Sequence, residues 1–173
     1  MIFIGVDPGL SGAFACIWDV GDAGLKVTVH DIPVIKVGKR HEYSVPEIIK
    51  FFENRKPCFV ALEALHAMPR TMCSVMGNFS LGRSSGLFEG IIAALKIPFD
   101  KVPPQRWKKI MLDGMPAGKN ASIVVARRLF PDVDLPRKKD HGKADALLMA
   151  EFVRRKYKEV PIDLLVLDPK ILD

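Results

Sequence analysis

The chain has 173 residues, of which 49% are hydrophobic and 27% charged, and this is the composition of one soluble globular domain with a sizeable core. No run approaches the roughly 20 apolar residues of a membrane span, and the N-terminus lacks the features of a signal peptide, so we expect a cytoplasmic protein. The net charge is +6, and the positive charge is concentrated in residues 101–158, which contain 15 Lys or Arg and only 6 Asp or Glu. This imbalance predicts a polyanionic partner such as nucleic acid, or alternatively a solvated basic face.

The N-terminal third predicts an antiparallel meander of three strands. Ile2–Val6 is an apolar run that predicts a buried strand, and a turn with Gly9 and Gly12 follows. Two further strands are expected at Ala13–Trp18 and Lys26–His30. Cysteines occur at 16, 58 and 73, with spacings that match no zinc motif, and we expect the first two in the core.

A helix and a second central strand follow a polar loop. In "SVPEIIKFFEN", Ser44 and Glu47 have the spacing of a capping box, and Pro46 suits a first turn. "PCFVALE" is an almost unbroken apolar run ending in Glu63, which is typical of a strand covered on both faces. A strand, a helix and a strand in this order predict that this strand lies parallel to the first.

The second half predicts mainly helices. We expect a loop at 65–82, a helix at about 83–96, a short strand in "IPFDKVP" and a short helix in "PQRWKKIM". Asn120 or Ser122 can cap a helix that ends at Phe130, and a last helix runs from near Gly142 to about Tyr157. The prediction is an α/β domain with a mixed sheet over residues 1–158, with the tail 159–173 unassigned.

Three acidic residues occur in or next to apolar segments that we expect to be buried, where a charged side chain is unusual. Asp7 and Glu63 end the two central strands, so parallel pairing would place them together at the ligand-binding edge of the sheet. Asp145 begins an apolar helix, and Asp140 and His141 precede it. Singly, each acid has a structural explanation, such as a turn after a strand or a helix start. Together they predict a site for Mg²⁺ or Mn²⁺, which prefer hard oxygen ligands.

The sequence resembles the RuvC group of Holliday junction resolvases, within the RNase H-like nuclease superfamily. The resemblance covers about residues 1–157 and is carried by "GVDPGLSG", "VALE", "FSLGRSSGLFEGIIAAL", "VPPQRWKKIM", "GKNASIVVARRLFP" and "GKADALLMA". The short length and the "HGKADALLMAEF" form are similar to phage-encoded members. A cytoplasmic enzyme of a bacterium or a phage-infected cell is therefore expected.

The resemblance implies an RNase H-like fold with a five-stranded mixed sheet, and a homodimer that resolves four-way DNA junctions. Asp7, Glu63 and Asp145 match the metal-binding acids of the group. A fourth ligand usually lies three residues before the last aspartate, where this chain has Gly142. Asp140 or His141 can substitute, and we expect Asp140, because a loop oxygen suits Mg²⁺.

The expected activity is that of a crossover junction endodeoxyribonuclease, with two Mg²⁺ or Mn²⁺ ions per subunit and products that carry 5′-phosphates. Lys119, in a glycine-containing turn, is a candidate to stabilise transition-state charge and to bind DNA. The other candidate DNA-binding residues are Arg83, Lys108, Lys109, Lys138, Lys139 and Lys143. For any single lysine, solubility is an equal explanation.

Two apolar segments have further interpretations. Met68, Met72 and Met76 have four-residue spacing, which is typical of a core stripe, or alternatively of a mobile wedge that enters an opened junction. The resemblance implies that the helix around Gly86 to Leu95 is the dimer surface. Rival functions are cleavage of RNA–DNA hybrids, nucleotide phosphotransfer and non-catalytic junction binding. The phosphotransferases need two such domains, so 173 residues argue against them.

Overall fold

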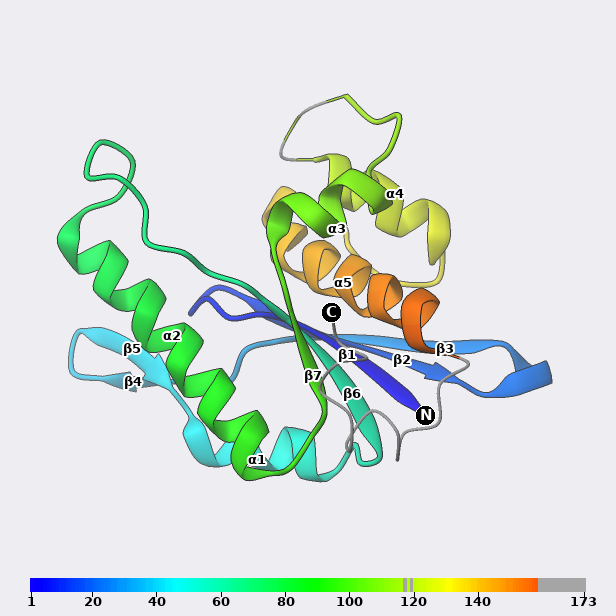
Figure 1. The fold of residues 1–173 in the computed structure, drawn as a ribbon, viewed down its shortest axis with the longest axis horizontal. Coiled ribbons are helices and arrows are strands. Elements are labelled where there is room, and N and C mark those ends of the chain that lie inside the picture. Colours follow the sequence, from blue (N-terminus) through cyan, green and yellow to red (C-terminus); the bar gives the residue numbers. More distant parts are fainter. Residues whose placement is uncertain (117, 119, 159–173) are drawn as a thin grey trace.

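The fold, seen in a computed structural model, is a five-stranded sheet between two layers of helices (Figure 1). The structure describes residues 1–116, 118 and 120–158. The sheet has the order β3-β2-β1-β6-β7, in which the strands are β1 (Ile2–Asp7), β2 (Ala13–Asp19), β3 (Leu25–Asp31), β6 (Cys58–Glu63) and β7 (Phe99–Val102). The predicted α/β class and five-stranded mixed sheet are confirmed.

The strand pairing places the two predicted central strands side by side. β1 pairs with β2, and β2 with β3, in antiparallel register, as the meander predicted. β1 and β6 are parallel, with Ile2 opposite Cys58 and Val6 opposite Leu62. Asp7 and Glu63 therefore follow paired positions at one edge of the sheet.

Successive residues of the central strands face different helical layers. In β1, Phe3 packs under α3 (Pro104–Met111), α4 (Ala121–Leu129) and α5 (His141–Tyr157). Ile4 and Val6 pack on the other face, which α1 (Val45–Glu53) and α2 (Val75–Ala94) cover (Figure 1). Both faces of the sheet are therefore buried, which explains the nearly continuous apolar runs of β1 and β6.

A glycine in β1 lets α5 approach the sheet closely. A Cβ atom built on Gly5 would overlap the carbonyl oxygen of Ala146 and would lie 2.8 Å from the nitrogen of Ala150. The backbone of α5 therefore lies directly against β1, and only glycine fits there. Because Ala146 follows Asp145, this contact fixes the N-terminal part of α5 relative to the end of β1.

Four local predictions were wrong. The polar loop after β3 contains a hairpin of β4 (Val34–Val37) and β5 (Arg40–Tyr43). α2 begins at Val75 instead of near residue 83, and the Ser74 hydroxyl caps it by accepting a 3.0 Å hydrogen bond from the N–H of Gly77. Ser44 precedes α1 but makes no side-chain cap, so the capping box does not form; nor does the Asn120 side chain cap α4.

The methionines do not form a core stripe. Met68, Met72 and Met76 are 50%, 76% and 67% exposed, and the first two precede α2. Both the amide N–H and the carbonyl of Met68 bond to the side chain of Asn78, each at 2.8 Å. Cys16 and Cys58 are buried, as predicted. Within the described part of the chain, no helix combines the length and apolar character that crossing a bilayer requires.

Candidate active site

A tight turn after β1 holds the first candidate carboxylate. The N–H of Gly12 donates a 2.9 Å hydrogen bond to the carbonyl of Gly9. A Cβ on Gly12 would overlap the carbonyl oxygen of Asp7, so the turn closes this tightly only with glycine. The side chain of Asp7 lies near the start of α5, since its Oδ2 would be 3.0 Å from a Cβ on Gly142.

Glu63 ends β6 and is oriented by a tryptophan of α3. The indole N–H of Trp107 donates to Glu63 Oε1 at 3.4 Å, across 44 positions of the sequence. Trp107 is completely buried, so its indole fills the core while its N–H reaches the carboxylate. Trp107 was not among the predicted site residues, although a buried tryptophan requires a hydrogen-bond acceptor.

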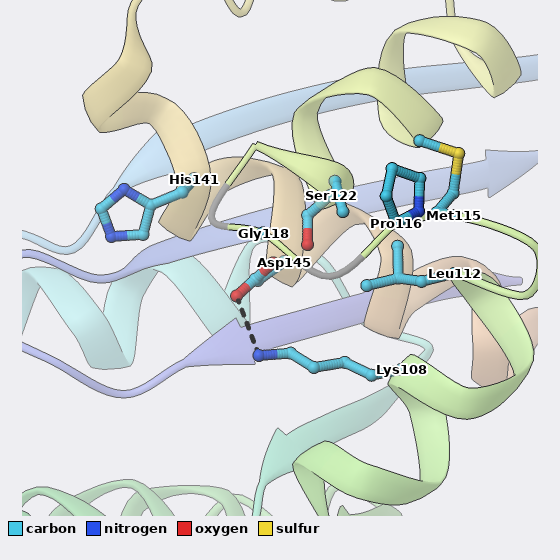
Figure 2. Close-up of a pocket in the computed structure, with 9 residues that line it drawn as sticks. Lys108, Leu112, Met115, Pro116, Gly118, Ser122, His141 and Asp145 are labelled. Carbon is cyan, nitrogen blue, oxygen red and sulfur yellow. Dashed lines mark ion pairs between the residues drawn. The ribbon is translucent and has the colours of Figure 1, made fainter.

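Asp145 lies on α5 and lines a cavity of about 440 Å³ (Figure 2). We call this the Asp145 cavity; its lining residues are Lys108, Leu112, Met115, Pro116, Gly118, Ala121, Ser122, His141 and Asp145. Lys108 Nζ is 3.8 Å from Asp145 Oδ2, as the dashed line in Figure 2 shows. Asp145 Oδ1 is buried and has no hydrogen-bond partner among the described residues. An unpartnered buried carboxylate oxygen is costly, and a cation would satisfy it.

The three carboxylates influence one another electrostatically. Burial, followed by the charge of Asp145, raises the pKa of Asp7 to about 6. Burial, followed by the charges of Asp7 and Asp145, raises the pKa of Glu63 to about 7. Burial also raises the pKa of Asp145. Desolvation and like charge both disfavour the ionised forms, and a bound cation would oppose both effects.

The fourth-ligand candidates lie in different surroundings. Asp140 is only 3% exposed, and its carboxylate accepts hydrogen bonds from the backbone N–H of Arg137 and from the Arg137 guanidinium, at 2.6 Å for Nη2. These bonds lower the pKa of Asp140. His141 lines the Asp145 cavity, and its charge lowers the pKa values of Asp7 and Asp145. His141 is therefore better placed than Asp140 to be a fourth metal ligand. The prediction of Asp140 is not tested by these contacts.

The predicted basic residues separate into different environments. Among those that the structure describes, Lys108 lines the Asp145 cavity, whereas Lys109 and Lys139 are exposed outside it. Lys143 is 16% exposed and forms a 3.0 Å ion pair with Asp31, so its position has a structural explanation. Arg83 forms an exposed 3.4 Å pair with Glu42. Lys119 and the side chain of Lys138 lie outside the described part of the structure.

The residues present suit a divalent cation by their chemistry. Among the described residues, no three His, Cys, Asp or Glu side chains lie close enough together to form a ready-made metal site. Asp7, Glu63 and Asp145 nevertheless share one electrostatic environment, and Asp145 contributes an unsatisfied oxygen. Carboxylate oxygens are the ligands that Mg²⁺ and Mn²⁺ prefer, so the donor set fits such an ion.

Tyr43 in β5 is a second residue that the sequence analysis missed. Its hydroxyl donates a 2.9 Å hydrogen bond to the carbonyl of Pro8, directly after Asp7. The same hydroxyl is 2.6 Å from the Ser84 hydroxyl on α2. Tyr43 thus connects the hairpin and α2 to the turn that holds Asp7. No sequence signal indicated this contact, because the hairpin itself was predicted to be a loop.

Comparison with solved structures identifies the architecture. The structure of RuvC from Thermus thermophilus superposes with a TM-score of 0.61 and 19% sequence identity, over 90% of this chain and 96% of that chain. The fold is that of RuvC. A T. thermophilus RuvC in complex with a Holliday junction substrate gives the same TM-score and coverage at 16% identity. The RuvC-like fold agrees with the resemblance seen in the sequence.

A sequence match of limited extent agrees with the RuvC-like fold. The chloroplastic Holliday junction resolvase MOC1 of Chlamydomonas reinhardtii is 39% identical over 69 residues. The match covers 39% of this chain and 8% of the length of MOC1. No protein-family model matches the sequence.

Proposed function

We propose that the protein is a structure-selective endonuclease that hydrolyses phosphodiester bonds in four-way junctions or other branched DNA. The observation that carries the proposal is the gathering of Asp7, Glu63 and Asp145 from β1, β6 and α5 at one edge of the RuvC-like sheet. The solved RuvC complex with a junction and the segment shared with MOC1 support a junction as the substrate. The basic residues of the second half of the chain suit a polyanionic partner.

The three carboxylates would hold Mg²⁺ or Mn²⁺, two ions per subunit, with His141 or Asp140 as a further ligand. Bound divalent ions supply an activated water and charge stabilisation for the leaving oxygen, which gives 5′-phosphate products. Trp107 orients Glu63 through its indole N–H, so that a carboxylate oxygen is held toward the site. A hydrogen bond that orients a metal-binding carboxylate tunes the affinity of the site for the metal.

Among the described residues, Lys108 is a cationic side chain at the site. Its ammonium lies 3.8 Å from Asp145 and 5.1 Å from the centre of the Trp107 ring. A lysine in the Asp145 cavity can contact a phosphate oxygen and stabilise the negative charge that develops there. We further propose that the enzyme acts as a homodimer, because two opposed strands of a junction require two sites.

The test compares Asp7→Asn with the wild type on a mobile four-way junction and on an RNA–DNA hybrid, with Mg²⁺. We expect Asp7→Asn to retain junction binding but to lose cleavage. The loss should exceed the roughly 10–100-fold that is typical when a residue hydrogen-bonded to a metal ligand is changed. Asp22→Asn, an exposed aspartate in the short helix η1 (Gly21–Ala23), is the matched control and should cleave normally. Paired symmetric nicks support a resolvase, whereas cleavage of the RNA strand alone or full activity of Asp7→Asn would contradict the proposal.

A further inference from the structure

A second concave surface borders the turn that holds Asp7, on the side of the hairpin. It is a groove of about 660 Å³ between the β4–β5 hairpin and the first half of α2. We call it the hairpin groove; its lining residues are Leu10, Ser11, Val34, Arg40, His41, Met76, Phe79, Ser80 and Arg83. A smaller cavity of about 200 Å³ continues from it to Tyr43 and Ser84.

The turn that holds Asp7 contributes to the hairpin groove and also lies close to the start of α5, where residues of the Asp145 cavity are found. Leu10 and Ser11 line the groove, and they follow Asp7 by three and four positions. The carbonyl oxygen of Ser11 would be 3.4 Å from a Cβ on Gly142, and the neighbouring His141 lines the Asp145 cavity. A strand with a phosphate at the carboxylates can therefore continue over the turn into the groove.

The lining of the hairpin groove combines positive charge with exposed apolar surface. Arg40, His41 and Arg83 line it, and none of its described lining residues is acidic, although Glu42 lines the smaller cavity beside it. Arg40 has no ion-pair partner in the described part of the chain, and the pair between Arg83 and Glu42 is exposed and hence weak. Phe79 is 65% exposed, so its ring is accessible to a ligand.

These properties favour an unpaired nucleic acid strand over a duplex. Proteins that bind single strands combine a positive groove for the backbone with aromatic side chains on which bases stack. Duplex DNA is usually read by a protein element that protrudes into a DNA groove, and this surface is concave instead. The volume is that of a site for one or a few nucleotides, within the roughly 300–1,000 Å³ of small-ligand pockets.

A second copy of the chain is a less suitable occupant. In a dimer with two-fold symmetry, an interface patch meets the same patch of its partner. Burying the hairpin groove in this way would bring Arg40, His41 and Arg83 close to their own copies, and juxtaposed like charges are costly.

We propose that the hairpin groove binds unpaired nucleotides of the DNA strand that adjoins the cleaved phosphate. This inference rests on the proposed endonuclease function and adds a binding site to it. Phe79 stacks on a base, and Arg40 and Arg83 contact the strand's phosphates. The groove thereby selects substrates in which a few nucleotides beside the cleavage point are not base-paired.

The experiment measures binding of three probes in EDTA: a 20-nucleotide oligo-dT, a fully paired 20-base-pair duplex and a four-way junction. We expect Phe79→Ala to weaken oligo-dT binding by about 5- to 150-fold and duplex binding hardly at all. Arg40→Ala should weaken oligo-dT binding and lower the slope of log affinity against log salt concentration by about 0.7. Ile35→Ala and Lys36→Ala change exposed hairpin residues that do not line the groove, and should leave oligo-dT binding unchanged.

The outcomes separate this inference from the proposed function. If the wild type cuts junctions and both Phe79→Ala and Arg40→Ala bind oligo-dT normally, the groove has no such role, while the endonuclease proposal stands. An equal loss of duplex and oligo-dT binding would also overturn the inference, because the groove would then not distinguish unpaired DNA. Sedimentation of each variant tests whether the groove is instead a dimer interface. If the wild type is a dimer and Phe79→Ala is a monomer, the surface binds a second copy of the chain and the inference is wrong.

Discussion

The two concave surfaces beside the Asp7 turn differ in how their charged groups are held. Asp145, which lines the Asp145 cavity, and Asp7 near the start of α5 are largely buried, and burial raises the pKa values of both carboxyls. In the hairpin groove, the charged groups are arginines at the surface beside exposed apolar side chains. The difference is the one expected between chemistry and binding, because desolvated groups with shifted pKa values are typical of catalytic sites, whereas solvated cations beside a stacking surface suit strand binding.

Among three further variants, the largest effect should come from changing Lys108 in the Asp145 cavity. We expect Lys108→Ala to slow cleavage of a bound junction about 100-fold, because it removes a positive charge from the Asp145 cavity. Lys109→Ala removes the same charge from an exposed neighbouring position and should leave the single-turnover rate unchanged. If Lys108→Ala weakens junction binding and leaves that rate intact, the division between chemistry and binding is wrong.

A smaller effect should follow from changing Tyr43, which links the hairpin to the turn that holds Asp7. Tyr43→Phe removes the hydroxyl that donates to the carbonyl of Pro8 and retains the ring that packs against Phe88. We expect about a tenfold loss in cleavage rate and a higher Mg²⁺ concentration for half-maximal activity, because Asp7 is held less firmly. Junction affinity in EDTA should not change.

The readouts for Tyr43 distinguish positioning from simple packing. Ser84→Ala, which leaves the bond from Tyr43 to Pro8 in place, should have a weaker effect on the Mg²⁺ requirement. An unaltered Mg²⁺ requirement in Tyr43→Phe, whatever its melting temperature, would show that Tyr43 is only a core residue.

The smallest effect concerns stability, and its sign follows from the raised pKa of Glu63. The folded protein holds a proton on Glu63 up to a pKa of about 7, whereas the unfolded chain releases it near 4.5. The free energy of unfolding therefore falls as pH rises from about 4.5 to 7, and this loss is complete above 7. Glu63→Gln has no carboxyl to ionise and therefore avoids this loss of stability. In EDTA at pH 8 we expect the melting temperature of Glu63→Gln to be about 3–6 °C above that of the wild type.

Three controls accompany this measurement of stability. The difference between Glu63→Gln and the wild type should disappear well below pH 4.5, where the carboxyl is protonated in both folded and unfolded chains. Glu47→Gln, an exposed glutamate in the first turn of α1, should show no such pH dependence. Mg²⁺ should raise the melting temperature of the wild type more than that of Glu63→Gln; a variant less stable than the wild type at pH 8 would contradict the burial argument.

The positions of Asp7 and Glu63 could be predicted from the sequence far better than the β4–β5 hairpin that forms the hairpin groove. Asp7 and Glu63 could be found because a charge at the end of a buried apolar strand is unusual, and parallel pairing then brings two such ends together. The hairpin escaped prediction because all four residues of β4 are exposed, so no buried face produces alternation of apolar and polar residues.

Other contacts depend on residues far apart in the chain. The bond between Trp107 and Glu63 spans 44 positions, and that between Tyr43 and Ser84 spans 41, so no periodicity can reveal them. The early start of α2 was missed because Gly77 and Gly82 lower helix propensity locally, while the cap from Ser74 and the bonds of Asn78 to Met68 favour the helix.

The close approach of α5 to Gly5 has a consequence for how the site can vary. Gly5 precedes Asp7 by two residues, and Ala146 follows Asp145, so the separation of two candidate ligands is set by one backbone contact. Any side chain at position 5 would lift α5, and with it Asp145 and His141, away from the sheet. The spacing of the carboxylates is thus determined in the interior of the protein, and even alanine at this glycine would change the distance between Asp7 and Asp145.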